Sequence, residues 1–118
     1  MPKSPVTIYH NPRCGKSRQT LGLIREAGVE PEIVEYLKDP PSAPQLERIL
    51  KSLGLEPRDV MRRNEKVYKE LGLAKRELSR KEAIRFLVEN PILIERPIVV
   101  KGKKAVLGRP PENVHELL

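Results

Sequence analysis

One cysteine, Cys14, is the side chain in this sequence best suited to nucleophilic or redox chemistry. It stands where a short strand is predicted to give way to a helix. The free backbone N–H groups and the positive end of the helix dipole stabilise a thiolate at such a place. The neighbouring Arg13, Lys16 and Arg18 are expected to add to this field. The sequence therefore predicts a reactive thiol.

The alternative is that Cys14 is a small core residue, because free cysteine is among the most buried residue types. Its neighbours favour the functional interpretation, since Pro12, Arg13, Gly15 and Lys16 do not resemble a core strand. A lone thiol cannot close an internal disulfide. Any redox cycle at Cys14 must therefore take a second thiol from another molecule.

Length and composition indicate one small α/β domain spanning residues 1–118. The net charge is +7, but there is only one Phe and no Trp, and the basic residues are spread along the chain. We therefore expect no nucleic-acid partner. No apolar run has signal-peptide or membrane-spanning character, and a single cysteine suits a reducing compartment. We expect a cytoplasmic monomer that does not bind membranes.

The first third of the chain predicts a strand, a helix and a second strand. Alternating residues indicate a strand over Val6–Tyr9, and apolar residues at helical spacing indicate a helix that stops at Gly28. A second strand is predicted over Glu32–Tyr36. The two strands of such a βαβ unit are parallel, and Cys14 follows the carboxyl end of the first, where open α/β sheets bind ligands.

The middle of the chain predicts helices. Capping-box pairs begin two of them, at Ser42 with Gln45 and at Ser79 with Glu82. The four predicted helices run from Ser42 to Gly54, Pro57 to Arg62, Lys66 to Leu71, and Ser79 to Asn90.

The last third returns to strands. Pro97–Val100 and Ala105–Leu107 flank a glycine-containing turn and predict an antiparallel hairpin, followed by a short helix from about Pro111. The expected fold is a four-stranded mixed sheet with a helical insertion between strands two and three.

Several stretches together resemble the glutaredoxin-linked family of arsenate reductases, in order and over nearly the whole chain. They are Ile8–Arg18, Arg62–Asn64, Tyr68–Leu73, Asn90–Val100 and Gly108–Pro110. This resemblance implies a thioredoxin-like fold. In such folds a cis proline commonly precedes the third strand, so the resemblance also implies a cis Arg96–Pro97 bond, although most X–Pro bonds are trans.

The resemblance implies that Cys14 is the nucleophile that attacks arsenate and that Arg62, Arg96 and Arg109 hold the oxyanion. Guanidinium groups suit this task because they are permanently charged and fork-shaped, and they offset the repulsion between a thiolate and a dianion. Each arginine has a plain alternative as a solvated surface charge or a partner for a carboxylate. At Arg62 the neighbouring Arg63 is a second candidate.

Four more residues around the first loop are candidates for the site. Two of them, His10 and Ser17, have two interpretations each. The resemblance implies that His10 helps lower the pKa of the thiol, but His10 could instead hydrogen-bond the loop. The amides of Gly15 and Lys16 and the Ser17 side chain are candidates for oxyanion binding, whereas Ser17 could also cap the helix.

The predicted function is reduction of arsenate to arsenite, an oxidoreductase reaction with glutathione as co-substrate and glutaredoxin resolving the mixed disulfide. Ser17 stands where a C-x-x-C motif would place a second cysteine, which motivates an external thiol. No bound cofactor and no metal are expected. Two alternatives remain: a non-catalytic or regulatory thioredoxin-fold module that binds another protein, and a different glutathione-dependent thiol reductase.

Overall fold

The computed structural model describes residues 5–118. Backbone contacts divide this part of the chain into two compact units. Unit 1 runs as far as Asp39 and resumes at Arg96, and unit 2 comprises Pro40–Glu95. The assignment of residues 1–118 to a single domain stays a prediction.

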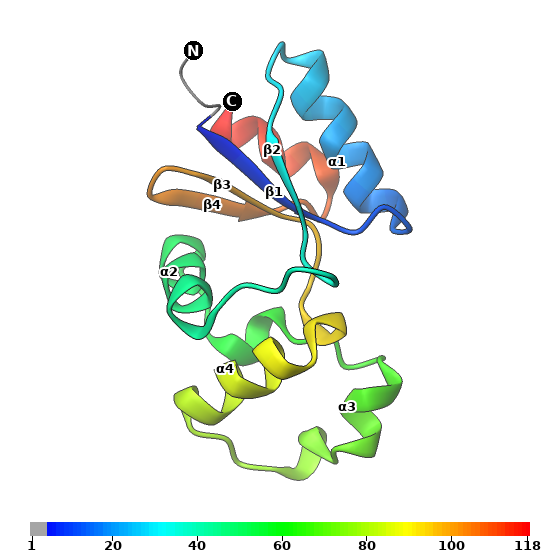
Figure 1. Ribbon diagram of the computed structural model, residues 1–118, viewed down its shortest axis with the longest axis vertical. Helices are drawn as coiled ribbons and strands as arrows, with labels where there is room; N and C mark the ends of the chain where they lie inside the picture. The colour runs from blue at the N-terminus through cyan, green and yellow to red at the C-terminus, as the bar shows by residue number, and fades with distance from the viewer. Residues whose placement is uncertain (1–4) are drawn as a thin grey trace. The chain divides into compact units, whose positions relative to one another are not determined.

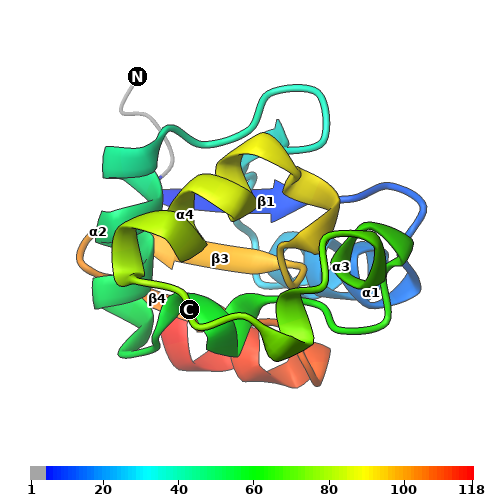
Figure 2. The ribbon, with the colours of Figure 1, turned by 90° about the horizontal axis from the view of Figure 1, so that it is seen from below.

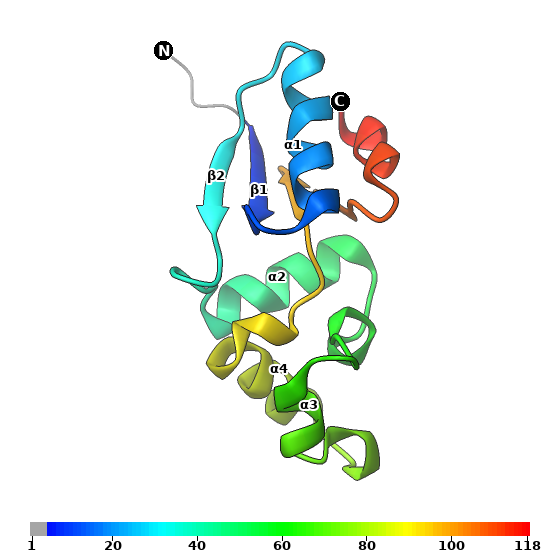
Figure 3. The same cartoon turned by 90° about the vertical axis from the view of Figure 1, so that its right-hand side faces the viewer.

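Unit 1 contains the four-stranded mixed sheet that the sequence predicts, with strand order β2-β1-β3-β4. β1 pairs parallel with β2 and antiparallel with β3, which pairs antiparallel with β4. The arrows of β1 and β2 point the same way in Figure 3, and those of β1 and β3 point opposite ways in Figure 2. The elements of unit 1 are β1 (Val6–His10), α1 (Gly15–Glu26), β2 (Glu32–Glu35), β3 (Ile98–Lys101), β4 (Lys104–Leu107) and η4 (Pro111–Leu117).

One face of the sheet is covered by α1 and the closing segment η4, which lie side by side (Figures 1 and 3). Strand β1 alternates buried and half-buried residues, so Val6, Ile8 and His10 share its buried side. Val6 and Ile8 pack with Ile24 of α1 in the core of this unit. His10 therefore points from the end of β1 toward the start of α1.

Unit 2 is built from helices, and two of them begin at the capping boxes that the sequence predicts. Ser42 accepts a hydrogen bond from the Gln45 N–H and Ser79 accepts one from the Glu82 N–H, with both return bonds present. Helices α2 and α4 lie next to each other (Figure 2). The elements of unit 2 are α2 (Ala43–Leu53), η1 (Pro57–Val60), α3 (Lys66–Glu70), η2 (Leu73–Lys75), α4 (Arg80–Glu89) and η3 (Pro91–Leu93).

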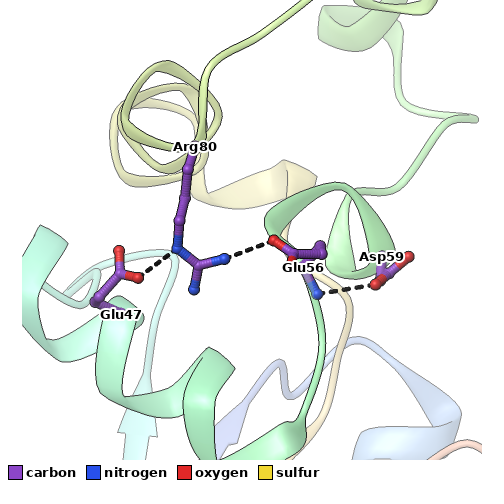
Figure 4. Close-up of polar contacts among 4 residues, drawn as sticks. All are labelled: Glu47, Glu56, Asp59 and Arg80. Carbon is purple, nitrogen blue, oxygen red and sulfur yellow. Dashed lines mark hydrogen bonds and ion pairs between the residues drawn. The ribbon is translucent and has the colours of Figure 1, made fainter.

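An arginine at the start of α4 ties three elements of unit 2 together (Figure 4). Arg80 donates from Nε to Glu47 of α2 and from Nη1 to Glu56, the residue before η1. Glu56 in turn donates its backbone N–H to Asp59 Oδ2 at 2.8 Å. Because Arg80 and both glutamates are partly or fully exposed, we regard these ion pairs as positioning contacts rather than a large source of stability.

The observed elements differ from the predicted ones mainly at their ends. The second strand stops at Glu35 rather than Tyr36, and the short helix predicted from Pro111 is a 3₁₀-helix over Pro111–Leu117. The helix predicted to reach Arg62 ends at Val60, because the Arg62 N–H donates to Leu93 O at 2.7 Å beside the Met61–Ile94 bridge. No helix in residues 5–118 is long and apolar enough to cross a membrane.

Gly108, just after β4, packs too closely for any side chain. A Cβ atom built there would lie 2.5 Å from Thr20 Oγ1 and 2.7 Å from Pro97 Cγ. Thr20 is fully buried in α1, and the Gly108 N–H donates to Pro97 O at 2.9 Å. This glycine therefore sets how closely the end of β4 approaches both α1 and the residue before β3.

We predict that Gly108→Ala lowers the free energy of unfolding by about 1–3 kcal/mol, the usual cost of overpacking. Gly22→Ala is the matched control, because Gly22 lies inside α1 and a Cβ atom there would meet nothing within 4 Å. That control should gain up to about 1 kcal/mol from helix propensity. Urea unfolding of the three proteins measures both effects, and equal stability of Gly108→Ala and the parent would contradict the packing.

Candidate active site

Cys14 is placed by a tight turn between β1 and α1. Its N–H donates to Asn11 O at 3.0 Å, and the Arg13 N–H donates to Asn11 Oδ1 at 3.0 Å. The carbonyl of Cys14 accepts the first helical hydrogen bond, from the Arg18 N–H at 3.0 Å. Cys14 is thus the N-cap residue of α1, half-buried, with its thiol beside the free amides of the first helical turn.

The surroundings lower the pKa of Cys14 below its ordinary value. Burial alone raises it, but four contributions outweigh burial: hydrogen bonds from the backbone N–H groups of Ser17 and Lys16, a hydrogen bond from the Arg96 side chain, and the charge of Arg96. Each of these stabilises the charged form of the sulfur. The predicted thiolate-favouring environment is therefore present.

Arg96, one of the arginines singled out from the sequence, is the cation whose side chain is a leading cause of the lowered Cys14 pKa. Lys16 acts through its backbone N–H, and neither Arg13 nor Arg18 is among the leading causes of the lowered Cys14 pKa. Arg13 and Lys16 are exposed, and Arg18 donates from Nη1 to Pro12 O at 2.9 Å. The expected contribution of the Arg13, Lys16 and Arg18 charges to the field around the thiol stays a prediction.

His10 and Ser17 form a buried pair beneath the turn. His10 Nδ1 lies 2.6 Å from Ser17 Oγ, and Ser17 Oγ accepts the Asn11 N–H at 3.0 Å. Burial is the main cause of a lowered His10 pKa, with smaller effects from Arg25 and Arg18 in the same direction and from Glu35 in the opposite one. Through this pair, His10 supports the Ser17 hydroxyl that binds the Asn11 N–H, and both residues hold the turn in place.

These contacts bear on the two interpretations left open for each residue. His10 is not among the leading causes of the Cys14 pKa shift, so the geometry favours its role as a support for the turn. The Ser17 hydroxyl is fully buried and bonds to the loop, not to the N-terminus of α1. Ser17 therefore faces the thiol through its backbone N–H. Gly15, the first residue of α1, is exposed.

Strand pairing brings Arg96 to the thiol. Tyr9 of β1 lies opposite Ile98 of β3 in an antiparallel register, so the residues after β1 run beside the residues before β3. Arg96 occupies that position, and the Arg96–Pro97 bond is cis, as the fold resemblance implied. The hydrogen bond and the positive charge of the Arg96 side chain are both among the causes of the lowered Cys14 pKa.

Arg109 joins this cluster from the end of β4. Its Nη1 donates to Arg96 O at 3.2 Å, which fixes the two arginines relative to each other. The Arg109–Pro110 bond is also cis, a feature that sequence reasoning missed. Unit 1 therefore brings together Cys14, His10, Ser17, Arg96 and Arg109.

Sequence reasoning also missed Asn113, which holds the loop that carries Arg109. Its Nδ2 donates to Leu107 O at 3.2 Å and to Arg109 O at 3.3 Å. An asparagine shortly after a turn commonly bonds to nearby backbone in this way, so its place after Pro110-Pro111 was an available signal. Asn113 thus positions Arg109 through the backbone.

Arg62 belongs to unit 2, where two carboxylates accompany it. Its Nε donates to Glu65 Oε2 at 2.9 Å, and its Nη1 lies 3.7 Å from Glu95 Oε1. The Arg62 side chain is 20% exposed, whereas Arg63 is exposed. Arg62 is therefore the more buried of the two candidates, and its role in oxyanion binding stays a prediction. Within residues 5–118, no group of three or more His, Cys, Asp and Glu side chains is arranged to hold a metal ion.

We predict that Arg96→Gln raises the apparent pKa of Cys14 alkylation, because it removes both the charge and the charged hydrogen bond at the sulfur. Arg13→Gln removes the same charge from the residue adjacent to Cys14 and should leave the alkylation profile near that of the parent. The rate of iodoacetamide modification as a function of pH measures both. Equal shifts in the two variants would show that only the overall positive charge matters.

We predict that His10 makes the protein less stable in acid. The His10 pKa is lowered by folding, so below the ordinary value of about 6.5 the unfolded chain binds the proton more readily than the folded one. Stability contributed by neutral His10 is therefore lost as pH falls from about 6.5 toward the lowered pKa. Between pH 7.5 and 5, the free energy of unfolding should fall more steeply in the parent than in His10→Gln. Parallel curves would contradict this account.

Comparisons with known proteins give a consistent assignment. The sequence profile of the ArsC family matches residues 9–117. YfgD of Escherichia coli K12, described as uncharacterized, is 54% identical over 114 residues that cover 96% of each chain. An arsenate reductase of Haemophilus influenzae is 46% identical over 114 residues, which cover 96% of this chain and 98% of the relative.

Solved structures agree with the sequence comparisons. The structure of an arsenate reductase from Vibrio cholerae superposes with a TM-score of 0.94 at 47% identity, covering 99% of this chain and 100% of that chain. The thioredoxin-like fold predicted from the sequence is thereby confirmed. Because the profile and these relatives match nearly the whole chain, the protein belongs to the ArsC family.

Proposed function

We propose that this protein reduces arsenate to arsenite, with the Cys14 thiolate as the nucleophile. The observation that carries the proposal is the position of Arg96, which the pairing of β1 with β3 brings beside the Cys14 turn and whose side chain lowers the pKa of the thiol. The names of similar proteins support the same substrate, since arsenate reductases of H. influenzae and V. cholerae match nearly the whole chain.

The main obstacle to this reaction is electrostatic. Near neutral pH, arsenate is a dianion, and a thiolate that approaches it meets strong repulsion. Arg96 and Arg109 are fixed relative to each other and place two permanent positive charges in the same unit as the thiol. In this proposal both guanidinium groups donate charged hydrogen bonds to the oxygens of the tetrahedral oxyanion. Arg62 supplies a third charge in this proposal, and the first-turn amides of Gly15, Lys16 and Ser17 supply neutral donors.

Once the oxyanion is bound, the Cys14 sulfur forms a bond to arsenic and an arsenate oxygen leaves as water. A glutathione thiol then attacks the Cys14 sulfur of the adduct, so that a sulfur–sulfur bond forms as the sulfur–arsenic bond breaks. Two electrons pass from the two sulfurs to arsenic, arsenite leaves, and Cys14 is left as a mixed disulfide with glutathione. The overall reaction converts arsenate and two thiols to arsenite, one disulfide and water, so atoms and electrons balance.

The second thiol must come from outside the chain, because Cys14 is the only cysteine. We propose glutathione as the co-substrate and glutaredoxin as the protein that reduces the mixed disulfide. No bound cofactor and no metal are part of this scheme. A reducing cytoplasm, where glutathione is available, is the proposed location, and a monomer is the proposed active form.

We predict arsenate-dependent NADPH oxidation when the protein is combined with glutathione, glutathione reductase and glutaredoxin, and complete loss of it in Cys14→Ser. A second arm replaces glutathione and glutaredoxin with thioredoxin and its reductase, which tests the choice of thiol donor separately from the substrate. Inorganic phosphate should compete with arsenate but give no oxidation.

Arg109→Gln should lower kcat/KM for arsenate about 10-fold or more, the usual size of one lost charged hydrogen bond. Arg48→Gln, an exposed arginine of α2, is the control for loss of charge and should match the parent. Absence of arsenate-dependent turnover with every thiol donor would overturn the proposed reaction, whereas turnover with thioredoxin alone would overturn only the proposed donor.

A further inference from the structure

Unit 2 contains a cavity of about 800 Å³ that uses none of the residues proposed for arsenate reduction. Three of its lining residues are arginines, Arg58, Arg63 and Arg76, and one, Glu77, is acidic. Cavities of this volume are large enough for a small organic molecule. The lining charge indicates which kind of molecule fits.

Two of the three arginines are held in place by neutral partners. Arg58 donates from Nη1 to Leu73 O at 3.2 Å and from Nη2 to Arg76 O, so it also closes the end of η2. The Arg76 guanidinium carbon lies 5.1 Å from the centre of the Phe86 ring. Carbonyl groups and an aromatic face orient a guanidinium, but they do not cancel its charge.

None of these three arginines has a carboxylate oxygen within 4.0 Å in the described range 5–118. This sets them apart from Arg25, Arg62 and Arg80, each of which forms an ion pair with a glutamate. Two carboxylates oppose this charge: Glu77 lines the cavity, and Glu82, whose pKa is lowered mainly by Ser79, also feels the charge of Arg76. Three arginines exceed these two carboxylates, so the concavity keeps a positive potential that an anionic ligand would lower.

We propose that this cavity binds the phosphate monoester of a small, partly apolar molecule. A phosphate dianion offers three terminal oxygens and about two negative charges to several guanidiniums, whereas a carboxylate offers two oxygens and one charge. Tyr68, Ala74 and Leu78 line the same cavity and offer apolar contact for the organic part of the ligand. This binding site is separate from the proposed reduction of arsenate and does not depend on it.

The test is a titration of the ¹⁵N-labelled full-length protein with phenyl phosphate, followed by amide chemical shifts. We expect saturable shifts of the amides of Arg63 and of residues 74–78. The affinity should fall about tenfold in Arg63→Gln and in Arg76→Gln, the usual effect of losing one charged hydrogen bond. Arg48→Gln, which removes one exposed charge from the same unit, should bind as the parent does. Arg63 is exposed, so its substitution leaves folding intact even if Arg76→Gln loosens the packing on Phe86.

Two further ligands identify the recognised group. Inorganic phosphate should shift the same amides with weaker affinity, because it lacks the apolar part, and benzoate should bind more weakly than phenyl phosphate. The shifts at residues 74–78 in Arg96→Gln should equal those of the parent, which separates this cavity from the residues around Cys14. The proposal is overturned by the absence of saturable shifts at residues 74–78, by shifts confined to the Cys14 turn, or by unchanged affinity in both Arg63→Gln and Arg76→Gln.

Discussion

The electrostatic interaction of the Arg96 side chain with the Cys14 thiol, which lowers the thiol pKa, is the interaction on which the candidate active site depends. A half-buried thiol in a polar turn is harder to ionise than one in water, because burial disfavours the charged form. Two backbone amides and one guanidinium reverse that effect. The thiol therefore ionises more readily than an ordinary cysteine, beside the side chain that would also receive an oxyanion.

Much of unit 1 serves to hold that geometry with uncharged contacts. The pairing of β1 with β3 sets Arg96 beside the turn, and the absence of a side chain at Gly108 lets the end of β4 approach Thr20 and Pro97. Below the turn, neutral His10 and Ser17 secure the Asn11 N–H. Rigid, neutral supports of this kind keep charged groups in place without adding competing charges.

The fold was largely predictable because its signals are local. Capping boxes at Ser42 and Ser79 marked helix starts, and a glycine-containing turn after Val100 marked the hairpin. The cations around the thiol were predictable only in part. Arg13 and Arg18 lie close to Cys14 in the sequence, but both are exposed. Arg96 is brought near the thiol by the pairing of β1 with β3, which no local pattern encodes. The support at Gly108 was missed for the same reason, since its neighbours Thr20 and Pro97 are set by tertiary packing. Asn113 bonds to backbone only four and six residues away, so its role was available to local reasoning.

The most direct measurement of the central claim is the mass of the intact reduced protein after incubation with glutathione, with and without arsenate, in the absence of glutaredoxin. If Cys14 attacks arsenate and an external thiol completes the reduction, one glutathione becomes attached to Cys14 only when arsenate is present, and an equal amount of arsenite is released. Glutathione attachment that is independent of arsenate, or arsenate-treated protein that stays fully reduced with no arsenite formed, would contradict the account.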